Sequence, residues 1–104
     1  MNTRIARLRE VLREKIVDAV LITKEENVCY FSGFRGDSTA LLVTQERLLL
    51  VTDSRYTEQA AAEAPLYEIV EQRDGLDRKI AELAAEIGVV ALGFEGAALV
   101  YERY

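Results

Sequence analysis

The sequence predicts an α/β fold in which one mixed sheet is layered between helices. Three observations lead to this prediction. Short, unbroken apolar runs, which are typical of buried strands, alternate along the 104 residues with segments of helical periodicity. Two of the apolar runs are separated by only a few polar residues, which indicates an antiparallel hairpin. Alternating strands and helices form a sheet covered by helices, and a hairpin inserted in that series makes the sheet mixed.

The N-terminal segment is predicted to be an amphipathic helix followed by an interior strand. Either Asn2 or Thr3 could cap the helix. Residues 19–22 form an apolar run without alternation, as expected for a strand that is covered on both faces. The apolar residues of the helix recur at helical spacing, in the order Ile5, Leu8, Val11 and Leu12.

A short second helix, a loop and the hairpin follow. Asn27 is expected to cap a helix that runs to Phe31 or Ser32. Gly33 can close that helix in the left-handed conformation, and residues 33–38 then form a loop. The hairpin consists of strands over 40–43 and 48–51 joined by residues 45–47, a turn without Gly or Asn whose type stays open.

The second half of the chain is predicted to continue the alternation. Its clearest element is a helix with one apolar face that ends at a glycine cap. In chain order the elements are a helix over 56–64 that Pro65 ends, a strand over 67–70, a helix from about Asp74 to Gly88, a strand over 89–94, and the opening turn of a further helix over 99–104.

The composition is that of one ordinary globular domain. A chain of 104 residues can bury a single core, and its 50% hydrophobic and 30% charged residues separate it from disordered chains. The formal net charge is −5. The densest basic stretch, residues 4–15, is interrupted by Glu10 and Glu14, so it is expected to be a solvated helix face. Nucleic-acid binding is therefore disfavoured.

Membrane insertion is also disfavoured, and the cytoplasm is the expected location. No apolar segment approaches the roughly 20 residues that cross a bilayer, and the chain begins with a polar, charged segment rather than a signal peptide. The single cysteine, Cys29, cannot form an internal disulfide, in agreement with a reducing compartment. Its apolar neighbours favour a buried small hydrophobe over a reactive thiol.

The sequence contains no histidine, which restricts its chemistry. Ser-His and Cys-His nucleophilic pairs are excluded, together with metal sites that need imidazole. Carboxylates alone could hold a metal, but Glu25, Glu26, Glu68 and Glu71 lie in polar stretches without ligand-like spacing. We therefore expect neither a catalytic nor a metal residue in this chain.

Two short motifs invite a binding function. Gly33 and Gly36 could cradle a phosphate or clamp RNA, but the Lys-Ser/Thr of a phosphate loop is lacking and a strand follows rather than a helix. A helix cap and a turn explain both glycines more simply. The tripeptide 35–37 matches a motif that cell-surface receptors recognise, but nothing in the sequence indicates secretion.

The loop after Gly33 is the first candidate site. Phe34, Arg35 and Asp37 are expected to form an exposed aromatic and charged loop, a surface that often carries function when a rigid scaffold presents it. The alternative is a local ion pair between Arg35 and Asp37, worth about 0–1 kcal/mol.

The segment that follows the second hairpin strand is the other candidate site. Asp53 or Ser54 is expected to cap the next helix. Arg55 and Tyr56 are expected to pack against the end of the sheet or against another domain. Capping is the preferred role, with an interdomain contact second.

Several motifs together resemble the N-terminal domain of the proline-specific metallopeptidases. In chain order they are VDAVLIT at 17–23, NVCYFSGFRGDS at 27–38, LLVT at 41–44, VTDSRYTEQA at 51–60 and LGFEG at 92–96. The family includes Xaa-Pro aminopeptidase, Xaa-Pro dipeptidase (prolidase) and creatinase. Cys29 stands where the family more often has Arg or a polar residue, which leaves the resemblance intact.

The resemblance implies a fold, a parent enzyme and partners. It implies a three-layer α/β/α, ribonuclease H-like domain over residues 1–104, followed in a longer protein by a C-terminal pita-bread catalytic domain. That domain would hold two divalent metals, often manganese in the family, on two Asp, one His and two Glu, and would hydrolyse peptides with proline at the second position. Residues 1–104 alone would be inactive.

The resemblance also implies a role for the first candidate loop. In a homodimer the loop would reach over the active site of the partner subunit, so that Phe34, Arg35 and Asp37 would lie near the substrate. The alternative, from a different class, is a free-standing α/β binding or assembly module without catalysis. The residues do not decide between an aminopeptidase and a dipeptidase.

Overall fold

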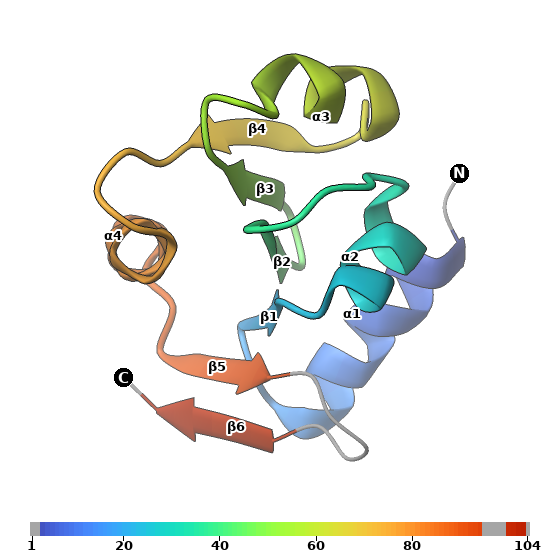
Figure 1. Cartoon of the computed structure of the whole chain (residues 1–104). Coiled ribbons are helices and arrows are strands. Elements are labelled where there is room, and N and C mark those ends of the chain that lie inside the picture. Colours follow the sequence, from blue (N-terminus) through green and yellow to red (C-terminus); the bar gives the residue numbers. More distant parts are fainter. Residues whose placement is uncertain (1–2, 95–99, 104) are drawn as a thin grey trace.

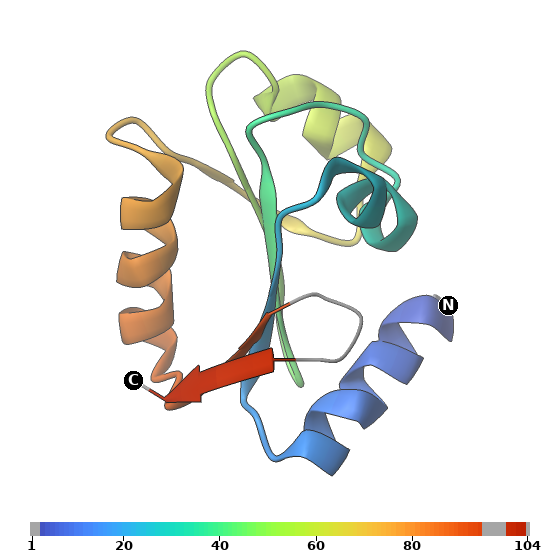
Figure 2. The ribbon, with the colours of Figure 1, turned by 60° about the horizontal axis from the view of Figure 1, so that its bottom comes forward.

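The protein is a three-layer α/β/α sandwich, as the computed structural model shows (Figures 1 and 2). The structure describes residues 3–94 and 100–103, the last four as backbone only. Its elements are α1 Thr3–Lys15, β1 Ala19–Ile22, α2 Glu25–Ser32, β2 Ala40–Thr44, β3 Leu48–Thr52, α3 Thr57–Glu63, β4 Glu68–Glu71, α4 Leu76–Ile87, β5 Ala91–Phe94 and β6 Val100–Arg103. None of the helices in this described part is both long and apolar enough to cross a membrane.

The strands form one mixed sheet in the order β4-β3-β2-β1-β5-β6. The pairs β1–β5 and β3–β4 are parallel, and the other neighbours are antiparallel. The predicted hairpin is confirmed as β2 and β3, with Ala40 opposite Val51. The hydroxyl of Thr44 accepts hydrogen bonds from the backbone N–H groups of Glu46 and Arg47, which closes the turn without Gly or Asn.

Helices cover both faces of the sheet, which explains the unbroken apolar strands. Figure 2 shows the sheet edge-on, with α4 on one side and α1, α2 and α3 on the other. Neighbouring strand residues enter opposite cores: Leu50 packs beneath α1, α2 and α3, and Leu49 packs beneath α4. Both leucines are fully buried, so both positions along the strand are apolar.

The start of α2 differs from the prediction. The helix begins at Glu25, so Asn27 lies inside it and does not cap it. The carbonyl of Lys24 accepts the N–H groups of Asn27 and Val28, which closes the first turn. Glutamates at the first two positions favour this start, because negative charge is stabilised at a helix N-terminus. The predicted end is confirmed, since Gly33 adopts the left-handed conformation with φ 87°.

The sequence predicts a solvated face for the arginines of α1, but three of them form hydrogen bonds with other segments of the chain. Arg9 donates from Nε to the carbonyl of Thr44 at 2.7 Å, and Arg13 donates to the side chain of Gln45 at 2.8 Å. Arg4 donates to the carbonyl of Tyr30 at 2.8 Å. These long side chains tie α1 to the hairpin and to α2. Asn2, the alternative cap of α1, lies outside the described residues.

The predicted helix over 99–104 is wrong for the residues that the structure describes there. Val100–Arg103 form strand β6, which pairs antiparallel with β5, and Arg103 lies opposite Ala91. A helix at this place would leave the backbone groups on the outer edge of β5 without these partners. Leu99 and Tyr104 lie outside the described residues.

Candidate functional site

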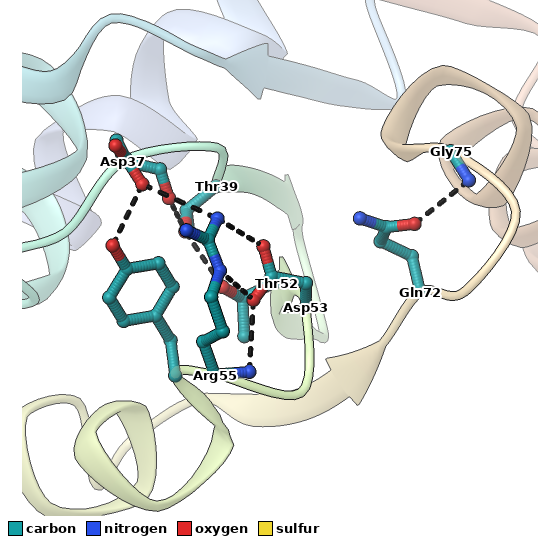
Figure 3. A network of polar contacts seen from close by, with 8 residues as sticks. Asp37, Thr39, Thr52, Asp53, Arg55, Gln72 and Gly75 are labelled. Carbon is teal, nitrogen blue, oxygen red and sulfur yellow. Dashed lines mark hydrogen bonds and ion pairs between the residues drawn. The ribbon is translucent and has the colours of Figure 1, made fainter.

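The two candidate segments meet at one end of the sheet (Figure 3). The loop after α2 leads into β2, and the turn after β3 leads into α3. Because β2 and β3 are antiparallel, the start of one and the end of the other lie side by side. We call the resulting set of polar side chains the Asp37 network; it consists of Asp37, Thr39, Thr52, Asp53, Arg55 and Tyr56.

Two buried threonines form the base of the Asp37 network. The Thr39 hydroxyl donates to the backbone carbonyl of Asp37 at 2.8 Å and lies 2.9 Å from the hydroxyl of Thr52 (Figure 3). Since Thr39 has one hydroxyl proton, Thr52 is the donor in their bond. A buried hydrogen bond of this kind is costly to break, because its partners would be left unpaired. It fixes the loop to the end of β3.

Arg55 lies between two carboxylates. Its guanidinium donates to Asp53 at 2.8 and 3.1 Å and lies 3.8 Å from an Asp37 oxygen. The hydroxyl of Tyr56 donates to Asp37 at 2.8 Å. The hydrogen bonds from Arg55 lower the pKa of Asp53, and the hydrogen bond to Asp37 raises the pKa of Tyr56. The polar groups of the network are thus held by one another.

Asp53 and Ser54 do not cap α3, contrary to the preferred prediction. The N-cap position is Tyr56, which makes no capping bond through its side chain. Asp53 is too early in the chain, and its carboxylate instead accepts the backbone N–H of Arg55 at 3.0 Å. Asp53 therefore closes the turn before the helix.

Phe34 is fully buried, so the prediction of an exposed loop aromatic is wrong. Its ring packs edge-on against Tyr56, with 5.7 Å between the ring centroids. The chain then passes over this ring at Gly36, where an added Cβ would lie 2.5 Å from Cζ of Phe34. The phenyl group is apolar and is therefore buried in the core, although the residues next to it in the sequence are glycines and polar residues. Phe34 anchors the loop instead of facing a ligand.

Arg35 is exposed, but its backbone is held at both ends by α3. Its N–H donates to a carboxylate oxygen of Glu63 at 2.8 Å, and its carbonyl accepts from Gln59 at 2.6 Å. The N–H of Arg35 lowers the pKa of Glu63. The alternative interpretation, a local ion pair between Arg35 and Asp37, is wrong for the described residues, where Asp37 pairs with Arg55.

Sequence reasoning did not identify Gln59, Glu63, Thr39 and Thr52 as supports of this site. Gln59 and Glu63 are four residues apart, a spacing that places two side chains on one helix face. That spacing is the signal in the sequence from which Gln59 and Glu63 could have been identified as a pair.

An open depression of about 580 Å³ lies beside the Asp37 network. Cys29 borders it and is only partly buried, so the prediction of a buried Cys29 is wrong. The side chains that line the depression offer charged and hydrogen-bonding groups to a polar ligand or to another protein surface. No three His, Cys, Asp or Glu side chains cluster as a metal site within residues 3–94. The lining consists of Glu25, Glu26, Cys29, Arg35, Gly36, Asp37 and Tyr56.

Replacing Asp53 with Asn is expected to make the free energy of unfolding depend less on pH in the acid range. The folded pKa of Asp53 is lowered, so its contribution is complete above the unfolded value of about 4 and is lost as the pH falls through the folded value. Asp53→Asn should be less stable than the parent at pH 7 and should lose less stability between about pH 5 and 3. Urea unfolding at a series of pH values measures both. Glu46→Gln, in the β2–β3 turn, is the control, and equal pH profiles for Asp53→Asn and the parent would contradict the assignment.

Comparison with known proteins places the whole described fold in one domain family. A sequence model described as the Creatinase/Prolidase N-terminal domain matches residues 4–104. The N-terminal domain of the cytoplasmic peptidase PepQ from Mycobacterium tuberculosis is 41% identical, with a TM-score of 0.84 over 91% of this chain and 74% of that one. The Xaa-Pro dipeptidase of Bacillus anthracis is 37% identical, with a TM-score of 0.82 over 89% of this chain and 26% of that one.

The curated relatives are much longer than this chain. The uncharacterized peptidase YqhT of Bacillus subtilis (strain 168) is 32% identical over 101 residues, which are 97% of this chain and 29% of the relative. Another relative is a probable Xaa-Pro aminopeptidase P of Tuber melanosporum (strain Mel28), of which the match covers 12%. The chain therefore spans less than a third of the length of these relatives.

Proposed function

The chain belongs to the creatinase/prolidase N-terminal domain family, and we propose that it is the non-catalytic N-terminal domain of a metal-dependent Xaa-Pro peptidase. The names of its relatives and the small share of their length that it matches support this proposal. The parent enzyme, an aminopeptidase or a dipeptidase, would hydrolyse the bond before a proline in the second position. Like the relative that is named cytoplasmic, it would act in the cytoplasm.

The metal centre would belong to the rest of that enzyme. The chain has no histidine, and its described residues contain no group of three ligands. The donors present do not fit a two-metal site, so we assign no catalytic step to them. Two divalent ions, manganese in our proposal, would be bound by the C-terminal catalytic domain.

The observation that carries the proposed role is the rigid presentation of the loop over 35–37. Glu63 and Gln59 hold the backbone of Arg35, and Tyr56 and Arg55 hold the carboxylate of Asp37. A loop ordered in advance loses little entropy when it meets a ligand. The guanidinium of Arg35 remains exposed beside the depression.

We assign this loop to the active site of the partner subunit in a homodimer. There Arg35 would donate hydrogen bonds to the peptide substrate, and Asp37 would keep the loop in its closed shape. Phe34 would contribute as the buried anchor of the loop. Arg55 and Tyr56 would serve as the inner support, with an interdomain contact as their second role.

Replacing Arg35 with Ala in the full-length enzyme is expected to lower kcat/KM for an Xaa-Pro peptide roughly 10–100-fold. A hydrogen bond from a charged donor is worth about 1.5–3 kcal/mol, and 1.4 kcal/mol corresponds to a factor of ten. Steady-state hydrolysis with manganese added measures the loss. Asp37→Ala should act in the same direction through the position of the loop.

The matched control is Arg78→Ala, which removes an exposed arginine from α4 on the opposite face of the sheet. It should leave kcat/KM unchanged, and the 104-residue chain alone should release no proline. Equal kinetics for Arg35→Ala and Arg78→Ala would contradict the role of the loop. Absence of Xaa-Pro hydrolysis by the parent enzyme would contradict the proposed function itself.

A further inference from the structure

Ile16, which follows α1, has a backbone conformation that suits glycine. Its φ is 56°, in the left-handed region where a β-branched side chain is strained. The side chain is 86% exposed, so burial within this chain does not compensate for the strain. Strained residues of this kind concentrate at functional surfaces, which makes the surroundings of Ile16 a candidate contact.

The end of α4 provides a comparison within the same chain. Both helices end in the same pair of hydrogen bonds: Val17 N–H to Leu12 carbonyl and Ile16 N–H to Arg13 carbonyl in α1, and the equivalent two bonds in α4. In α4 the left-handed position is occupied by Gly88, with φ 85°. The motif therefore works with glycine here, and isoleucine in α1 is not required by the fold.

Apolar side chains surround Ile16 at this end of the sheet. Val90 is 57% exposed, and Ile87 and Val89 line the same hollow as Ile16. Asp18 joins the two segments, because its carboxylate accepts the N–H of Val90 at 2.8 Å. We call the accessible apolar side chains here the Ile16 patch; it consists of Ile16, Ile87 and Val90, whereas Val89 is buried in the core on the α4 side of the sheet. Its rim is polar: Arg13, Gln45 and Glu46 line the hollow too.

The course of the chain indicates which surface could cover the patch. Strand β6 runs antiparallel to β5, so Arg103 lies opposite Ala91, one residue from Val90. A polypeptide that continued from β6 would leave the domain beside the Ile16 patch. In the relative from Bacillus subtilis, 29% of the length matches this chain, so most of that protein lies outside the match.

We propose that the Ile16 patch is the surface on which the C-terminal domain of the same polypeptide docks, through apolar side chains of its own. This inference rests on the proposed function, which supplies the second domain. A tethered domain is present at high effective concentration, so a small apolar patch with a polar rim is sufficient. The strain at Ile16 is then compensated by burial in the assembled protein and not in the isolated domain.

The test is whether Ile16→Gly shifts the thermal midpoint in opposite directions in the isolated chain and in the full-length protein. In the 104-residue chain, Ile16→Gly should raise the thermal midpoint by about 4 °C, because it relieves the strained φ. In the full-length protein the same variant should lose the apolar contact and lower the midpoint of this domain. Differential scanning calorimetry of both forms measures the two shifts.

Variants that introduce a charge into the Ile16 patch test the proposed docking independently. Ile16→Asp and Val90→Asp in the full-length protein should make the N-terminal domain unfold in a separate, lower transition and should speed proteolytic cleavage between the domains. The control is Leu66→Asp, because Leu66 is 62% exposed beside the opposite edge strand, β4. It should change neither measurement.

Two outcomes would overturn the proposal. Ile16→Asp and Val90→Asp could behave like Leu66→Asp in the full-length protein, or the isolated chain could form a dimer that Ile16→Asp abolishes, which would assign the patch to a second copy. Xaa-Pro hydrolysis is measured separately. A full-length protein without that activity would refute the proposed function and still report on docking through its unfolding transitions.

Discussion

Replacing Phe34 with Ala is expected to lower the free energy of unfolding by about 3–5 kcal/mol, a large part of the total for a domain of this size. The ring is fully buried and belongs to the core that α1, α2 and α3 form on one face of the sheet. Removing it would leave a cavity under the loop and take away the packing partner of Tyr56. Urea unfolding followed by circular dichroism measures the loss.

Two variants define how the loss at Phe34 is interpreted. Phe34→Leu keeps a smaller apolar side chain in the core and should cost clearly less than Phe34→Ala. Leu66→Ala shortens an exposed side chain and should stay within about 0.5 kcal/mol of the parent. A loss below about 1 kcal/mol for Phe34→Ala would contradict its position in the core.

The elements of this fold could be predicted because their signals are local. The strand over 48–51 is apolar at each position, since both faces of the sheet are covered, and the helix that ends at Gly88 shows its apolar face directly in its spacing. The pairing of β2 with β3 follows from a three-residue turn. Each of these inferences depends on neighbours within a few residues, and each is confirmed.

The position of the candidate site could be predicted from the sequence, but the role of each residue in it could not. Phe34 stands among glycines and charged residues, so its neighbours predict exposure; it is buried by residues distant in the sequence, among them Tyr56, 22 positions later. The partner of Asp37 is likewise Arg55 and not the nearby Arg35. Strand β6 was not predicted: Val100 and Tyr101 suit a strand, but the pairing with β5 that holds it there is not contained in the local pattern. Contacts between distant segments are what the sequence pattern does not contain.

Replacing Gly36 with Ala is expected to destabilise the domain by about 1–3 kcal/mol through overpacking. The added Cβ would lie 2.5 Å from Cζ and 2.7 Å from Cε2 of Phe34, distances that force the ring or the loop to move. The φ of Gly36 lies outside the left-handed region, so the backbone itself accepts alanine and the cost is steric. In the full-length enzyme the displaced loop should also lower kcat/KM for an Xaa-Pro peptide.

A double-mutant cycle separates this steric cost from any backbone effect. Leucine at position 34 has no atoms where Cε2 and Cζ of Phe34 lie, so Gly36→Ala should cost less than about 0.5 kcal/mol in the Phe34→Leu background. The coupling between the two positions should then fall in the range of about 0.5–3 kcal/mol that contacting residues show. If Gly36→Ala cost the same in both backgrounds, the contact with Phe34 would not be its cause. A measured coupling would show that the buried ring determines the path of the loop, and hence where Arg35 is held.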